Sequence, residues 1–205
     1  MSSLKKTLVI KLDPKDPDKR ALAYCAKEIR EGRLVAFPTE TVYGIAANLL
    51  DKKAIARLYK VKKRPRRKPF TVHIARVSAM ARMGCKVTRE AKRLIDKFWP
   101  GPLTIILRSR SGAKIGFRMP SNRIASELIR ISKVPIVAPS ANISGSRAPA
   151  RPEDVLRGLR SKIDLLIDGG RTDEGIESTV VDLTVTPPKV LREGAISRRE
   201  LFASL

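Results

Sequence analysis

Histidine, cysteine and aromatic residues are all scarce in this chain of 205 residues. His73 is the single histidine, which excludes a histidine-based metal cluster and does not favour a Ser-His-Asp triad. The two cysteines, Cys25 and Cys85, match no zinc-binding spacing and are too few for a disulfide framework, so we expect free thiols in a reducing compartment. Aromatic residues make up only 4% of the chain, which leaves a base-stacking platform poorly supplied.

Long apolar runs and the standard phosphate-binding loops are also missing. No stretch approaches the roughly 18 apolar residues of a membrane-spanning helix, and the N-terminal segment lacks the apolar core of a secretory signal. Neither G-x-x-x-x-G-K-[ST] nor G-x-G-x-x-G occurs. We therefore expect a cytoplasmic protein without membrane contact, which handles any nucleotide outside these motifs.

Positive charge is what the chain has in excess. It carries 43 Lys and Arg against 20 Asp and Glu, for a net charge of +23. This charge favours nucleic acid, nucleotides or another polyanion as partners, with solubility or adaptation to the cell as the alternative. Seven of the nine residues at 60–68 (KVKKRPRRK) are basic. Because of Pro65 and Pro69 we do not expect this run to form the interior of a helix. It could be a solvated loop, a nucleic-acid arm or one wall of a phosphate site.

The apolar pattern predicts interspersed strands and helices. Strands are expected at 7–12, 33–37, 70–75, 103–108, 114–119, 134–138, 164–168, 178–183 and 189–192. Helices are expected at 18–31 and 51–59 and beginning at 88, 121 or 122, 152 and 197. Because some strands follow helices and others follow strands directly, we predict a single α/β domain with a mixed sheet.

Polar residues gather at four strand-to-loop transitions. These are PTETVYG at 38–44, the basic run with His73 on the strand after it, APSANISG at 138–145, and GIESTVVDL at 175–183 with LREG at 191–194. Each loop alone could be an ordinary turn with capping hydroxyls. Because open α/β sheets build their sites at strand ends, the four together favour one site.

Seven segments also resemble, in order and spacing, the YrdC-like family, whose members are threonylcarbamoyl-AMP synthases. They are PTETVYG, KKRPRRKPFTVHI, FWPGPLTIIL, GFRMP, PIVAPSANISG, ESTVVDL and VLREGAI. The similarity runs from about residue 18 to 200 and includes the paired signature K-x-R (Lys62, Arg64) and S-x-N (Ser140, Asn142). It implies a single domain over 1–205 with a twisted mixed sheet, helices packed on it and a large basic cavity, as in the short family members that have no further C-terminal domain.

The resemblance also implies a reaction. L-Threonine, bicarbonate and ATP would condense to threonylcarbamoyl-AMP and pyrophosphate, for the t6A modification of tRNA by a separate threonylcarbamoyltransferase. Mg²⁺ would arrive with ATP, so no metal ligands are assigned to the protein. Such a reaction needs positioning and charge stabilisation, which suits lysine and arginine. The alternative is a double-stranded RNA or tRNA binder that uses the basic cavity, and direct tRNA binding stays open in both cases.

Site roles follow from the resemblance residue by residue. The catalytic pair would be Lys62 and Arg64. Threonine would contact Thr41, Tyr43, His73, Arg118 and Ser178. ATP would contact Thr39, Lys62, Arg64, Lys68, Ser140, Asn142 and Arg192. The structural alternatives are a backbone-satisfied histidine for His73, a surface cation for Arg118, and purely structural roles for Ser178 and Arg192.

Three consecutive basic residues depart from the family pattern. Arg66, Arg67 and Lys68 stand where the family commonly has a small or acidic residue and an asparagine. Lys68 could replace that asparagine as a phosphate ligand. Arg66 and Arg67 exceed what the site needs, and we leave open whether they contact RNA or form a solvated rim.

Overall fold

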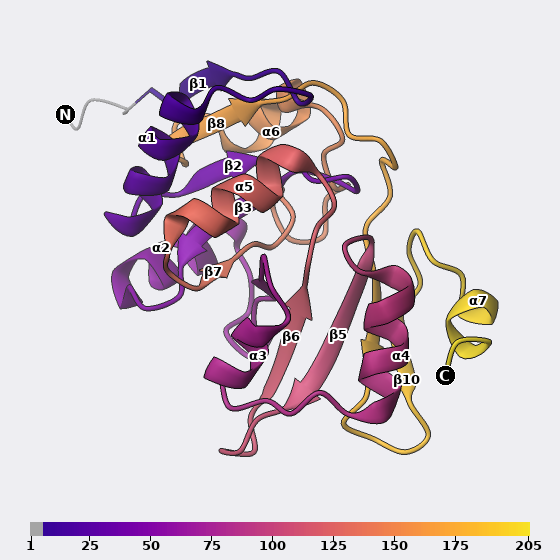
Figure 1. The fold of residues 1–205 in the computed structure, drawn as a ribbon. Coiled ribbons are helices and arrows are strands. Elements are labelled where there is room, and N and C mark those ends of the chain that lie inside the picture. The colour runs from indigo at the N-terminus through magenta and orange to yellow at the C-terminus, as the bar shows by residue number, and fades with distance from the viewer. Residues whose placement is uncertain (1–5) are drawn as a thin grey trace.

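One mixed sheet runs through the whole molecule. The structure is a computed structural model, and it describes residues 6–205. Its sheet has 10 strands in the order β1-β8-β2-β3-β7-β4-β6-β5-β9-β10 (Figure 1). In Figure 1, β1 and β8 run across the view whereas β5 and β6 stand nearly upright, so the sheet is strongly twisted. The α/β class and the mixed, twisted sheet are thus confirmed.

The first half of the sheet lies between two layers of helices. Strands β1 (Leu8–Lys11), β8 (Leu165–Asp168) and β2 (Val35–Phe37) are parallel, and β3 (Gly44–Asn48) is antiparallel to β2. Helices α1 (Lys19–Arg30) and α5 (Arg123–Ser132) share one apolar cluster with these strands, and α6 (Pro152–Leu159) belongs to the other. Alternate residues of β8 enter opposite clusters, as a strand buried on both faces requires.

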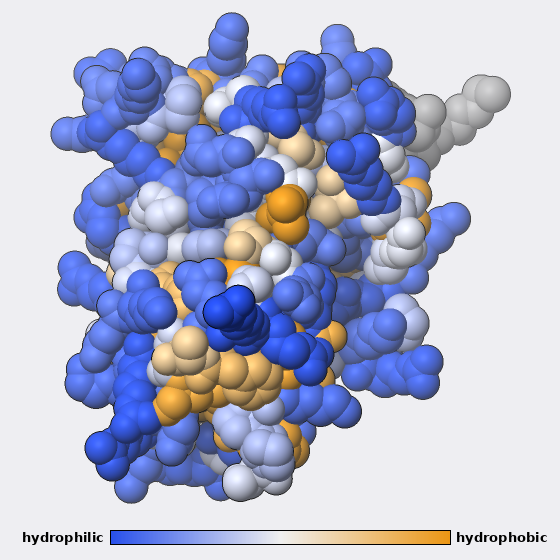
Figure 2. All heavy atoms as spheres, turned by 90° about the vertical axis from the view of Figure 1, so that its right-hand side faces the viewer, coloured by the Kyte–Doolittle hydropathy of each residue, from blue (hydrophilic) through white to orange (hydrophobic). Residues whose placement is uncertain are grey.

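The second half of the sheet contains both its longest strand and its two shortest. Its strands are β7 (Ile136–Val137), β4 (Val72–His73), β6 (Lys114–Arg118), β5 (Leu103–Arg108), β9 (Thr179–Asp182) and β10 (Lys189–Arg192). Helices α3 (Ser78–Arg82), α4 (Arg89–Phe98) and α7 (Arg198–Phe202) accompany it, whereas α2 (Lys52–Lys62) contacts β3 of the first half. The face that carries α7 is largely hydrophilic with one apolar patch in its lower part (Figure 2). No helix within residues 6–205 has the length and apolar character needed to cross a bilayer.

Five helices begin where the sequence predicts their start, and each start has a side-chain cap. The side chains of Asp18, Asp51, Thr88, Asn122 and Ser197 each accept a hydrogen bond from a backbone N–H in the first turn that follows. Such caps satisfy N–H groups that have no partner inside the helix. Both cysteines are buried and free, as expected.

The expectation that the whole basic run 60–68 lies outside a helix is wrong. Helix α2 continues to Lys62, so the first three residues of the run form its last turn. Lys63 then adopts the left-handed conformation, with φ at +51°, and ends the helix. Pro65 restricts only the residue before it, which leaves the helix free to extend to that point.

Other expected boundaries also shift. The strand expected at 70–75 shrinks to Val72–His73, and the one expected at 134–138 shrinks to Ile136–Val137. Strand β3 and the short helix α3 were not expected at all. All five residues of β3 are buried, so GIAAN shows no polar–apolar alternation by which a strand could be recognised.

Candidate active site

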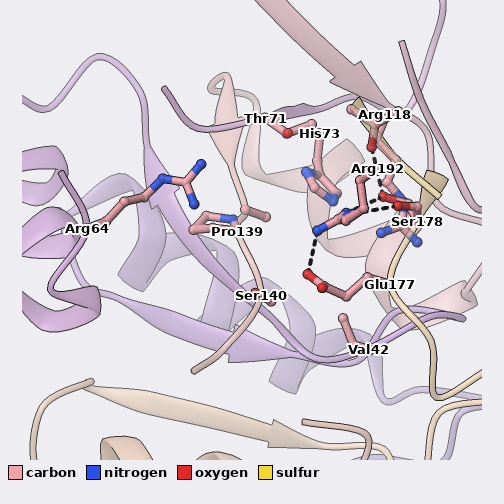
Figure 3. A pocket seen from close by; sticks show the side chains of 12 residues that line it. Val42, Arg64, Thr71, His73, Arg118, Pro139, Ser140, Glu177, Ser178 and Arg192 are labelled. Carbon is pink, nitrogen blue, oxygen red and sulfur yellow. Dashed lines mark hydrogen bonds and ion pairs between the residues drawn. The ribbon is translucent and has the colours of Figure 1, made fainter. Parts of the chain in front are cut away.

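The four polar loops converge on one cavity of about 110 Å³. It is lined by Val42, Arg64, Thr71, His73, Thr104, Arg118, Ala138, Pro139, Ser140, Glu177, Ser178 and Arg192 (Figure 3). Arg64 approaches from one side, whereas Arg118 and Arg192 approach from the opposite side. The lining therefore concentrates positive charge on a small volume, where anionic groups bind best.

The loop after β2 fixes one of these arginines. Thr39 forms the turn: its hydroxyl donates to the Val42 carbonyl at 2.7 Å and accepts from two backbone N–H groups. The Arg118 Nη2 donates to Glu40 Oε1 and to Thr41 Oγ1, at 2.7 Å each. Burial lowers the pKa of Arg118, and the neighbouring Glu40 carboxylate acts in the opposite direction and favours the charged guanidinium.

His73 is a neutral side chain of the cavity wall. It lies on β4, paired with Arg118 of β6, and is only 4% exposed. Burial, with a contribution from the Arg118 charge, lowers its pKa to about 3, so the imidazole carries no charge at physiological pH. Its Nδ1 has no hydrogen-bond partner among the described residues. An unpaired, buried ring nitrogen in a cavity wall is free to accept a hydrogen bond from a ligand or to donate one.

Lys62 is turned into the protein and holds the S-x-N loop. Its side chain is 1% exposed, and its Nζ donates to the carbonyls of Ser140 and Asn142, the second at 2.8 Å, and weakly to Asn142 Oδ1 at 3.4 Å. The Ser140 hydroxyl donates to Asn142 Oδ1 at 2.7 Å, and the Asn142 amide donates to the Ser146 carbonyl at 2.6 Å. Burial lowers the pKa of Lys62 to about 8. The K-x-R and S-x-N motifs thus meet through this ammonium group.

Arg64 presents its guanidinium to the cavity. Nε donates to the Lys68 carbonyl at 2.9 Å and Nη2 to the Pro69 carbonyl at 3.0 Å, while the group lies 5.3 Å from the centre of the Phe70 ring. The loop 65–68 therefore folds back over Arg64 and orients it. Unlike Arg118 and Arg192, Arg64 has no carboxylate partner among the described residues, which leaves its charge available to an anion.

Arg192 and Ser178 form the third side of the cavity. Arg192 donates from Nε to the Ser178 carbonyl at 3.0 Å, from Nη1 to Glu177 Oε1 at 2.6 Å and from Nη2 to Ser178 Oγ at 3.1 Å. The hydroxyls of Ser178 and Thr104 are 2.9 Å apart. This cluster joins the ends of β9 and β10 to β5, so the arginine comes from the sheet rather than from a free loop.

The predicted site residues divide into three groups. Those that line the cavity are Arg64, His73, Arg118, Ser140, Ser178 and Arg192. Those that contact lining side chains or their backbone are Thr39, Thr41, Lys62, Lys68 (through its carbonyl) and Asn142. The structure places the Tyr43 hydroxyl elsewhere, bonded to Gly169 and Gly170, and the side chain of Lys68 is exposed. The roles of all these residues in ligand binding stay predictions.

Sequence reasoning did not single out the two carboxylates of the site. Glu40 pairs with Arg118 and Glu177 pairs with Arg192. Each glutamate directly precedes a predicted hydroxyl residue, in the pairs Glu40–Thr41 and Glu177–Ser178. That repeated acid–hydroxyl pair was the available signal, and only the fold shows that each pair meets an arginine distant in sequence.

The comparisons with known proteins agree on one family. A family model named for Sua5, YciO and YrdC, described as "Telomere recombination", matches residues 27–194. A protein of Pyrococcus abyssi named threonylcarbamoyl-AMP synthase is 45% identical over 182 residues, 84% of this chain and 54% of its own length. A Bacillus subtilis protein of the same name is 39% identical, over 94% of this chain and 58% of its own. The solved P. abyssi Sua5 complexed with L-threonine superposes with a TM-score of 0.92 at 40% identity, covering 97% of this chain and 61% of that one.

This chain belongs to the Sua5/YciO/YrdC family. It spans just over half the length of the first curated relatives. The fold implied by the resemblance is thus confirmed, whereas the large size of the expected cavity and the extent of the domain in the whole protein stay predictions.

Proposed function

We propose that this protein condenses L-threonine, bicarbonate and ATP to threonylcarbamoyl-AMP and pyrophosphate. The observation that carries the proposal is the meeting of the K-x-R and S-x-N motifs with three cavity-lining arginines in a chain similar to an L-threonine-bound Sua5. The relatives named as synthases support it, and they do not favour the RNA-binding alternative.

The chemistry asks the protein to hold two anions together. The threonine amine and bicarbonate give N-carboxythreonine with loss of water, and its carbamate oxygen then attacks the α-phosphorus of ATP while pyrophosphate leaves. We assign the threonine carboxylate to Arg118 and the phosphates to Arg64, Ser140 and Arg192, all of which line the cavity.

The protein's own groups act by orientation and charge. Neutral His73 would hydrogen-bond the amino acid through Nδ1 without adding charge to the cavity. Arg64 and Arg192 would stabilise the negative charge that develops on the phosphates during transfer. Mg²⁺, carried with ATP, would neutralise phosphate oxygens and needs few protein ligands. Lys62 would act mainly by fixing the Ser140–Asn142 loop against these phosphates.

The proposal is tested by mass spectrometry of the product formed from ATP, ¹³C-labelled bicarbonate and L-threonine. We expect a labelled threonylcarbamoyl-adenylate whose appearance needs all three substrates and is lost when EDTA removes Mg²⁺. Pyrophosphate released without threonine, or threonine dependence without label incorporation, would contradict the proposal. Binding of tRNA measured as a function of salt tests the alternative, because phosphate contacts give a steep loss of affinity with salt.

A further inference from the structure

Two acid–hydroxyl pairs hold two arginines of the cavity in the same way. Arg118 contacts the carboxylate of Glu40 and the hydroxyl of Thr41, at 2.7 Å each. Arg192 contacts the carboxylate of Glu177 at 2.6 Å and the hydroxyl of Ser178 at 3.1 Å. The two pairs come from opposite ends of the chain and from loops next to different strands. A shared arrangement at two unrelated places indicates a shared task.

Neither acid–hydroxyl pair occupies all the N–H donors of the arginine that it holds. An arginine carries five N–H donors. Arg192 uses three of them, on the Ser178 carbonyl, Glu177 and the Ser178 hydroxyl. Arg118 uses two, both on Nη2, and its Nε has no partner among the described residues although it is buried. The contacts therefore fix the plane of each guanidinium without saturating it, and they leave donors for a ligand anion.

The backbone around both glutamates is itself held firmly. The Glu40 carbonyl accepts from the Glu174 N–H at 2.8 Å, and the Thr41 carbonyl accepts from the Thr172 hydroxyl at 2.8 Å. The Glu177 carbonyl accepts from the Ala195 N–H at 3.0 Å. At Gly194, an added Cβ would lie 2.1 Å from the Glu177 carbonyl oxygen, so only glycine allows this close approach. Both carboxylates thus sit on rigid supports, as an orienting group must.

We propose that Glu40 and Glu177 are positioning residues, each serving its own arginine and its own substrate. Glu40 holds Arg118 for the threonine carboxylate, and Glu177 holds Arg192 for the phosphates of ATP. The inference rests on the proposed function for the identity of the two substrates. It assigns a role to two acidic residues in a site otherwise described by its cations.

If the glutamates instead weaken anion binding, their replacement changes ligand affinity in the opposite direction. A carboxylate beside a binding arginine also repels an incoming anion and competes for its N–H groups. If Glu177 acted mainly in this way, its replacement by glutamine would tighten ATP binding. If it acts by orienting Arg192, the same replacement loosens ATP binding, because one charge-assisted hydrogen bond that holds the guanidinium is lost.

The test is a crossed comparison of Glu40→Gln and Glu177→Gln with the wild-type protein. We expect Glu40→Gln to raise the KM for threonine about tenfold and leave the KM for ATP within twofold. Glu177→Gln should do the reverse. Tenfold corresponds to about 1.4 kcal/mol, within the range of one charge-assisted hydrogen bond. The matched control is Asp173→Asn, an exposed carboxylate of the loop that carries Glu177, which should change neither KM.

Conservative variants separate orientation from folding. The Glu40–Arg118 pair is nearly buried, with side chains 7% and 6% exposed, so Glu40→Gln leaves a buried arginine without its counter-charge and destabilises the fold more than Glu40→Asp. The melting temperature of each variant is therefore measured first. Glu40→Asp keeps the charge and should recover part of the threonine KM. The Glu177 side chain is 36% exposed, so Glu177→Gln is expected to fold.

Three results would overturn the proposal: tighter ATP binding by Glu177→Gln, equal shifts of both KM values in either variant, or no shift in any folded variant. A wild-type protein without synthase activity would instead contradict the proposed function. In that case the role of Glu177 is still tested by calorimetric measurement of inorganic pyrophosphate binding to wild type and to Glu177→Gln. Weaker binding by the variant supports the orienting role, and equal or tighter binding refutes it.

Discussion

Replacing Lys62 by methionine would test how this buried lysine works. Methionine keeps most of the apolar stem and removes the ammonium group. In the structure that group is bonded to the carbonyls of Ser140 and Asn142. The variant therefore removes a charge-assisted hydrogen bond from each of these part-buried carbonyl oxygens, of which the Ser140 oxygen keeps a bond from the Asn142 N–H. Each lost bond to a charged group costs roughly 1.5–3 kcal/mol. The loop that carries the S-x-N motif should loosen as a result.

The difference in the free energy of unfolding between wild type and Lys62→Met should depend on pH, because burying the charge of Lys62 is itself costly. Burial lowers its pKa from 10.5 to about 8 in the folded protein. Below pH 8 the lysine is charged in both folded and unfolded chains, and the wild type carries the full penalty of about 3 kcal/mol, at 1.36 kcal/mol per pKa unit. Between pH 8 and 10.5 the folded state releases this proton first, so the penalty disappears.

The stability of wild type relative to Lys62→Met should therefore rise by up to about 3 kcal/mol from pH 8 to pH 10.5. Near pH 7 the free energy that the variant loses with the hydrogen bonds is partly offset by the free energy gained when the buried charge is removed. Urea unfolding of both proteins at pH 7, 8, 9 and 10.5 measures the difference, and other titrating groups contribute equally to the two proteins and drop out. A difference that stays constant over this range, or falls, would refute the burial argument for Lys62.

Three further predictions concern the rest of the site. Arg64→Ala should lower threonine-dependent pyrophosphate release at least a hundredfold with the fold retained, as circular dichroism can show, because the variant loses the one lining guanidinium whose charge no carboxylate of the described residues neutralises. Wild-type stability should fall as pH drops from 6.5 towards 3, by up to about 5 kcal/mol, because His73 is neutral in the fold and charged when unfolded; His73→Asn should lack this component of acid unfolding. Exposed Arg66 and Arg67, both replaced by alanine, should leave turnover within twofold, and a larger loss would place them in the site.

Local features of the sequence predict most of the secondary structure. The five capping side chains and the apolar faces of α1 and α4 are readable because helix ends and periodicity depend on near neighbours. Strand β3 is missed for the opposite reason. Strands β2 and β7 pair with both its edges, helices α1 and α2 contact it, and those contacts decide its structure.

The candidate site shows the same division between local and tertiary information. Motif resemblance brings Arg64, Arg118 and Arg192 to notice, and the fold does gather them around one cavity. The resemblance does not show that Lys62 turns its ammonium away from that cavity, because the acceptors of this group lie 78 and 80 residues further along the chain. Nor does it show the pairing of Glu177 with Arg192, since the geometry of β9 and β10 creates that contact.

The net charge of +23 is not concentrated in the cavity. The site holds Lys62 and three arginines against Glu40 and Glu177, which is a small excess, so most of the positive charge lies elsewhere on the molecule. Surface charge acts on approach rather than on the bound state, because salt screens it over about 8–10 Å, whereas buried pairs are screened much less. Raising the salt concentration should therefore raise the KM for ATP and leave kcat unchanged. A kcat that falls with salt while the KM holds would mean instead that the surface charge acts on the chemical step.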